Sequence, residues 1–183
     1  IYTLSLHDAL PIYLQPVLQK EQVSGTVAVQ ADESDAETDW LLQLAGEHDF
    51  IRGVVGWTDL SAPELPEVLR RYADHPRLKG FRAITQGKPE EQYFGNKDFI
   101  RGVRSLHAYG FTYDLLIYHD QFPEAIRFTE KCPDQRFMLD HLGKPAIAAR
   151  EIKKWSENMR ILSANPNVYC KLSGMVTEAD WKK

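Results

Sequence analysis

Short apolar segments recur along this chain about every 30 residues, and each is rich in β-branched or aromatic residues. The six segments are 26–30, 54–57, 79–82, 112–118, 137–141 and 168–172. Their length suits β-strands, whereas the stretches between them carry apolar residues at helical spacing. Alternating strands and helices predict parallel strands joined by right-handed crossovers, in either an open doubly wound sheet or a barrel.

Helical spacing marks the segments between these strands. Phe99, Val103 and Leu106 fall at i, i+4 and i+7, so they line one face of a helix. The segments 34–37 and 61–64 each fit a capping box, in which a serine accepts from the backbone and a glutamate reaches back. We therefore expect two helices to begin there.

Polar residues stand near the ends of most of the expected strands: Gln30, Asp59, Arg82, His119, His141 and Lys171. A barrel builds its site in this way, from side chains that converge on the carboxyl face of the sheet. An open sheet would be favoured by a Gly-x-Gly-x-x-Gly loop after the first strand, and the sequence has none. The pattern therefore favours an α/β barrel.

The strongest candidate for chemistry is His141, which follows the apolar run 137–139 and precedes a Leu-Gly-Lys-Pro turn. An imidazole titrates near neutrality and can donate to a carbonyl oxygen that gains negative charge. A buried histidine satisfied by the backbone is the alternative. Asp140 either orients His141 or caps the turn at Gly143, and we name both His141 and Asp140 as candidate catalytic residues.

Five further residues are candidate substrate contacts. Arg82 either clamps a carboxylate or hydroxyl through two hydrogen bonds or forms a salt bridge across the strand ends. Lys171 serves either catalysis or a structural ion pair. His119 faces the site or caps the next helix, and Trp57 flanks a sugar-like ring or belongs to the core. Gln30 is included because it ends the first expected strand.

The composition disfavours several classes of partner. A net charge of -4 with a pI near 5.9 offers no basic face to a nucleic acid, and no apolar run is long enough to span a bilayer. Cys132 and Cys170 have no metal-ligand spacing and suit a reducing compartment. We expect a cytoplasmic protein that acts on a small molecule, and we assign no metal ligand.

Taken together, the segments resemble the amidohydrolase-related family of predicted metal-dependent hydrolases, particularly its sugar-lactonase branch. The matching pieces are 25–31, 54–60, 80–82, 113–116, 139–145 and 170–174. The resemblance implies an incomplete (β/α)8 TIM-like barrel with strands 2 to 7 present. It also implies a hydrolase that opens a sugar-acid lactone, or a related cyclic ester, by water attack, with His141 stabilising the oxyanion and Arg82 holding the substrate.

The same resemblance leaves a divalent metal such as zinc open for the full-length protein, because His141 alone cannot make a three-ligand site. The family's first strand, with a His-x-His pair, and its last, with an aspartate, have no counterpart here, so we expect an inactive fragment. A decarboxylase or hydratase on the same barrel and a non-catalytic binding protein are the alternative functions.

Residues 1–12 are a separate case, because they match the translation of a common sequencing adapter residue for residue. We expect this segment not to be native, so His7 and Asp8 receive no weight as site residues. The expected domain is the partial barrel at 13–183.

Overall fold

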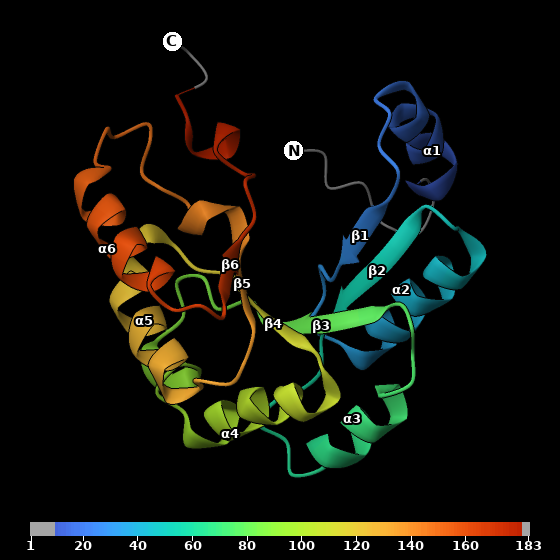
Figure 1. Cartoon of the computed structure of the whole chain (residues 1–183), viewed down its shortest axis with the longest axis horizontal. Coiled ribbons are helices and arrows are strands. Elements are labelled where there is room, and N and C mark those ends of the chain that lie inside the picture. Colours follow the sequence, from blue (N-terminus) through green and yellow to red (C-terminus); the bar gives the residue numbers. More distant parts are fainter. Residues whose placement is uncertain (1–9, 181–183) are drawn as a thin grey trace.

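The computed structural model describes residues 10–180, in which strands and helices alternate along the chain (Figure 1). The strands are β1 (Thr26–Val29), β2 (Ile51–Gly56), β3 (Leu78–Arg82), β4 (Thr112–Leu115), β5 (Phe137–Leu139) and β6 (Val168–Cys170). They form one sheet in the order β1-β2-β3-β4-β5-β6, and every neighbouring pair is parallel. The expected parallel pairing is therefore confirmed, and the sequential order is that of a barrel rather than of an open doubly wound sheet.

The α-helices are α1 (Leu10–Lys20), α2 (Asp35–Glu47), α3 (Leu65–Tyr72), α4 (Lys97–Ser105), α5 (Phe122–Lys131) and α6 (Lys153–Ser163). Short 3-10 helices are η1 (Glu90–Gln92), η2 (Leu106–Tyr109), η3 (His119–Gln121), η4 (Asp140–Gly143) and η5 (Val176–Glu178). No helix within 10–180 is long and apolar enough to cross a membrane. Of the segment 1–12, which we expect not to be native, residues 1–9 lie outside the described residues and the rest begin α1.

The sheet is curled, and helices α2 to α6 lie along its outer side (Figure 1). β1 and β6 are the two edges of this curl in the described part of the chain. A parallel curled sheet with its helices outside is the arrangement of an incomplete TIM-like barrel. The expected α/β fold class is therefore confirmed.

The core lies between the sheet and these outer helices. Phe99, Val103 and Leu106, which helical spacing placed on one face, are all buried there. The ring of Tyr113 on β4 meets that of Phe128 on α5 edge-on at 5.9 Å, and Phe99 stacks on Phe128 at 6.0 Å. Aromatic packing of this kind holds α4 and α5 against the strands, and so fixes where the strand ends point.

Four strands are shorter than expected, because the chain leaves the sheet at its carboxyl edge. β1 ends at Val29, β4 at Leu115, β5 at Leu139 and β6 at Cys170. After Leu139 the backbone turns into η4, where His141 has a φ of 52°. A left-handed residue cannot continue a strand ladder, so the residues expected to end the fifth strand form a turn instead.

The two expected capping boxes are not formed as predicted, although the first serine does cap its helix. Ser34 begins α2 as expected, since its hydroxyl accepts from the Glu37 N–H at 3.2 Å, although the Glu37 carboxylate binds the preceding loop rather than reaching back to Ser34. The second box, 61–64, is a turn before α3, which begins at Leu65 without a side-chain cap among the described residues. The N–H of Ser61 donates to Asp59 there, so the serine belongs to the loop after β2.

Candidate active site

Four charged side chains meet at the carboxyl ends of β3 to β6. Arg82 ends β3, and its Nη1 donates to Oδ2 of Asp140 at 2.8 Å. Lys171 follows β6, and its Nζ lies 2.6 Å from Oδ1 of Asp140 and 2.5 Å from Oδ2 of Asp114 on β4. The charges therefore alternate along Arg82, Asp140, Lys171 and Asp114, and we call these four residues the rim cluster.

The register of the sheet brings these four side chains together. Arg82 pairs with Asp114 across β3 and β4. β5 and β6 end level with each other, so the residues that follow them, Asp140 and Lys171, also lie side by side. Successive side chains of a strand point to opposite faces, so Arg82 and Asp114 point away from the core face that Phe81 and Tyr113 occupy.

Burial sets the electrostatics of the rim cluster. The side chains of Asp114 and Asp140 are 1% and 0% exposed, against 29% for Lys171. Burial raises the pKa of Asp114 to about 6, although the Lys171 ammonium opposes the rise. Burial alone would lower the pKa of Lys171, but the two carboxylates raise it above its usual value. Lys171 is therefore a cation at neutral pH, whereas Asp114 titrates within about one pH unit of neutrality.

Gln30 supports the cluster from the end of β1. Its side chain is buried, and Nε2 donates to the backbone oxygen of Arg82 at 3.0 Å. Nη2 of Arg82 donates in return to the backbone oxygen of Gln30. The guanidinium thus makes the salt bridge across the strand ends that was the alternative for Arg82, and its contact with substrate stays a prediction.

His141 stands beside the cluster in an unusual turn. His141, Leu142, Gly143 and Lys144 all have positive φ, between 47° and 65°. The turn is held by the Trp155 indole, whose Nε1 donates to the oxygen of Leu142 at 2.7 Å. Three non-glycine residues in the left-handed region are costly, so this conformation depends on such contacts from the surrounding structure.

The imidazole of His141 lies with its Nδ1 3.0 Å from the Ser173 hydroxyl, after β6. Burial lowers the pKa of His141 below its usual value, although the nearby Asp140 carboxylate opposes this. The ring is therefore mostly neutral at pH 7, and a neutral imidazole donates through one nitrogen and accepts through the other. This chemistry suits polarisation of a carbonyl group.

Asp140 differs from both expectations for it. Its carboxylate neither orients His141 nor caps the turn at Gly143, since both of its oxygens engage Arg82 and Lys171. A buried carboxylate binds a guanidinium or an ammonium more strongly than it binds a neutral backbone N–H, so Asp140 pairs with the cations at the neighbouring strand ends.

Sequence reasoning missed Asp114 and Ser173. Asp114 lies within the expected strand 112–118, and the available signal was a lone acid inside an otherwise apolar strand. Such an acid needs a cation as its partner, and Lys171 supplies it.

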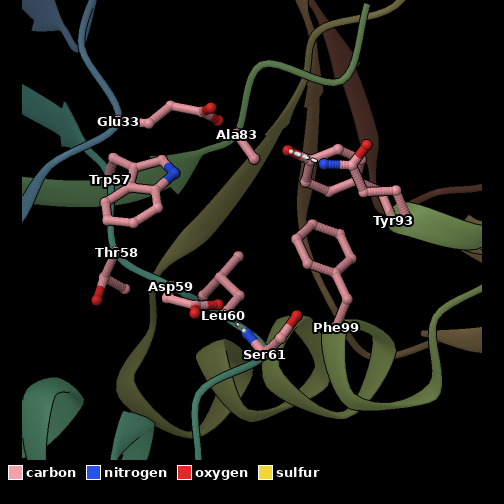
Figure 2. A pocket seen from close by; sticks show the side chains of 10 residues that line it. Glu33, Trp57, Thr58, Asp59, Leu60, Ser61, Ala83, Tyr93 and Phe99 are labelled. Atoms are coloured by element: carbon pink, nitrogen blue, oxygen red, sulfur yellow. Dashed lines mark hydrogen bonds between the residues drawn. The ribbon is translucent and has the colours of Figure 1, made fainter. Parts of the chain in front are cut away.

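Two expected site residues lie in other hollows. Trp57 lines a pocket behind the rim, together with Glu33 and Asp59 (Figure 2). His119 begins η3 and lines a separate hollow with Trp155 of α6. The structure therefore joins Gln30, Arg82, Asp140, His141 and Lys171 at the rim, and it places the other two residues apart from them.

The rim residues do not by themselves fit a metal ion. Within residues 10–180, no three His, Cys, Asp or Glu side chains converge to hold one. Asp114 and Asp140 already pair with cations, and His141 adds a single nitrogen. A zinc site needs three or four such ligands, so no chemical step is assigned to a metal here.

The curled parallel sheet, with polar groups at its carboxyl edge, has the architecture of a TIM-like α/β barrel, and the chain belongs to the amidohydrolase family, whose model matches residues 7–183. The expected family is therefore confirmed. The chain is 38% identical over 182 residues to an L-fucono-1,5-lactonase of Burkholderia multivorans, and 32% identical over 172 residues to one of Burkholderia ambifaria. These matches cover 96% and 94% of this chain, and 61% and 59% of the relatives.

A solved structure agrees with these sequence matches. An amidohydrolase from Burkholderia multivorans with bound zinc superimposes with a TM-score of 0.90 at 39% identity, covering 96% of this chain and 62% of that one. The chain thus spans about three fifths of the length of the relatives that it matches.

Proposed function

We propose that this chain carries part of the active site of a hydrolase that opens a sugar-acid lactone by attack of water. The observation that supports it is the rim cluster with His141 beside it, in a chain 38% identical to an L-fucono-1,5-lactonase. Barrels of this architecture carry their chemistry at the carboxyl ends of the strands. The substrate class is therefore a neutral cyclic ester of a sugar acid.

His141 donates a hydrogen bond to the lactone carbonyl as its oxygen gains negative charge. Lys171 is the partly exposed cation of the cluster, and it adds positive potential at the same edge. Arg82, which is held by Gln30, pairs with one oxygen of Asp140, and the other oxygen of Asp140 holds Lys171 in place. In this proposal Arg82 and Gln30 act indirectly, because they position Lys171, and Lys171 contacts the substrate.

Two finer points belong to the proposal. Zinc is bound in a similar structure, and because residues 10–180 hold no group of three metal-ligating side chains, a zinc site in this protein would draw ligands from outside that part of the chain. Cys132 and Cys170 are both free thiols, which supports a cytoplasmic location.

The test is a chimaera in which residues 13–180 replace the matching part of the Burkholderia multivorans relative. Acid release from L-fucono-1,5-lactone is followed with a pH indicator. We expect His141→Ala to lower kcat about 10²- to 10³-fold, the usual effect of removing one oxyanion donor. The matched control is His107→Ala, an exposed histidine of η2, which should keep full activity. Full turnover by His141→Ala, or an inactive chimaera that is folded, would reject the proposal.

A further inference from the structure

The pocket that Trp57 lines has a volume of about 290 Å³ and lies at the carboxyl ends of β1, β2 and β3 (Figure 2). Its walls come from the loops after these three strands and from Tyr93 and Phe99, which lie before and within α4. Ala83 and Phe99 also belong to the apolar core, on the face of the sheet from which Arg82 points away. None of the four residues of the rim cluster lines the pocket, so it is a separate site.

Three aromatic side chains form two facing walls of the pocket. The indole of Trp57 lies on one side, and the rings of Tyr93 and Phe99 face it from the other (Figure 2). These two rings meet edge-on, with their centroids 5.1 Å apart. The Trp57 backbone is held by one hydroxyl, because Thr38 Oγ1 accepts from its N–H and donates to its oxygen, each at 2.8 Å. Walls fixed in this way are formed before any ligand arrives.

Two carboxylates complete the lining. Glu33 accepts from the N–H of Ile84 at 2.8 Å, and Asp59 accepts from the N–H of Ser61 at 2.8 Å, so backbone groups orient both side chains. None of the lining residues is Lys, Arg or His. Within residues 10–180, the ion pairs of the chain include neither Glu33 nor Asp59. The negative charge of the pocket is therefore not balanced by a cation from this part of the chain.

The two carboxylates act on the same space, between the aromatic walls. Burial raises the pKa of Tyr93 above its usual value, and the charges of Glu33 and Asp59 both add to the rise. Two like charges beside one partly apolar space repel each other, and a cation placed between them removes this cost. The aromatic faces favour the same kind of ligand, because the ring quadrupole attracts positive charge, and most strongly at Trp.

We propose that this pocket binds a small organic cation that carries a methylated ammonium group. The methyl groups pack on the walls formed by Trp57 and Tyr93, where the rings attract the charge that the methyl groups carry. A primary ammonium has three N–H donors that each need an acceptor, and the aromatic walls offer them none. Glu33 and Asp59 repel an anion. The inference goes beyond the proposed function, because it assigns a ligand of different chemistry to a site outside the rim cluster.

The test is titration of the full chain with choline, followed by saturation-transfer NMR of the choline methyl protons. The matched ligand is neohexanol, in which a neutral tert-butyl group replaces the trimethylammonium group and the shape is kept. We expect choline to bind about tenfold more tightly than neohexanol, because only choline gains from the rings and the carboxylates. Added salt should weaken the binding of choline and leave that of neohexanol unchanged.

Substitutions place the binding in this pocket. Glu33→Gln together with Asp59→Asn removes both charges but keeps an oxygen that can accept from the same backbone N–H groups, so the fold should persist. This double variant should weaken choline binding about tenfold, and Trp57→Leu should weaken it about 3- to 30-fold. The matched control is Glu91→Gln, which removes an exposed charge next to the pocket from a residue that does not line it, and it should leave choline binding unchanged.

Four results would overturn this inference. They are no saturation transfer to choline from the folded chain, equal binding of choline and neohexanol, undiminished choline binding in the double variant, or the same loss in the Glu91→Gln control. The titration contains no lactone and leaves His141 intact. Failure of the lactonase proposal and failure of the cation pocket are therefore separate outcomes.

Discussion

The buried carboxyl of Asp114 should make this protein less stable as the pH rises from 4 to 7. Its side chain is 1% exposed, and burial raises its pKa from 3.8 to about 6 despite Lys171 at 2.5 Å. A group whose pKa is higher in the folded state than in the unfolded state stabilises the fold most at pH values below its unfolded pKa. That contribution is lost as the pH rises through the folded pKa. The perturbation that removes it is Asp114→Asn, which cannot titrate.

The magnitude follows from the size of the shift. A change from 3.8 to about 6 is roughly 2 pKa units, and each unit corresponds to about 1.4 kcal/mol. Because the unfolded carboxyl is already partly ionised at pH 4, the free energy of unfolding of the wild type should fall by roughly 2 kcal/mol relative to Asp114→Asn between pH 4 and pH 7. Solvent screening reduces this little, because the carboxyl is buried. Lys171 stays charged across this window and adds no slope of its own.

The assay is urea unfolding of both proteins at several pH values, followed by circular dichroism. The difference in unfolding free energy between wild type and variant is the quantity to plot, since other titrating groups cancel in it. Asp98→Asn is the control, because Asp98 is an exposed carboxyl on α4 and its difference should be nearly flat. A flat difference for Asp114→Asn, or one that rises with pH, would refute the reasoning.

Two further substitutions test how the rim and the pocket are held. Gly143→Ala should lower the free energy of unfolding in urea by about 2 to 4 kcal/mol, because Gly143 has a φ of 65° and an added Cβ would lie 2.4 Å from the Phe122 ring. A loss under about 1 kcal/mol would contradict a rigid turn at this position. Thr38→Val should cost about 2 kcal/mol, because it leaves the Trp57 backbone groups without the hydroxyl, whereas Thr38→Ser should retain most of the stability. Equal losses for Val and Ser would contradict this role of the hydroxyl.

Local pattern was enough to predict the strands and the helices between them, since apolar segments and helical faces are properties of neighbouring residues. It failed at the strand ends, where distant contacts decide the backbone. The expected strand 137–141 stops at Leu139 because the following turn is left-handed and is held by Trp155 of α6. The residues next to the turn in sequence do not predict its hydrogen bond with Trp155.

The site shows the same division. Arg82, Asp140 and Lys171 were identified because polar residues at the ends of apolar strands are unusual. Asp114, which pairs with Lys171, was not identified. In sequence it is a single acid within a strand, and only the register of the sheet places it beside Arg82 and Lys171. Trp57 and His119 occupy equivalent positions in sequence, yet the structure places them in other hollows.

The sequence by itself determined the class of fold, the family and the edge of the sheet where polar groups collect, because alternation and strand-end chemistry are written in residues close together along the chain. Only the tertiary structure decided which charges pair, that Asp140 binds two cations, and that a tyrosine on β4 is buried without an acceptor for its proton. Ion pairs and buried hydrogen bonds act over a few ångströms. They therefore depend on register and curl, which set distances between residues far apart in sequence.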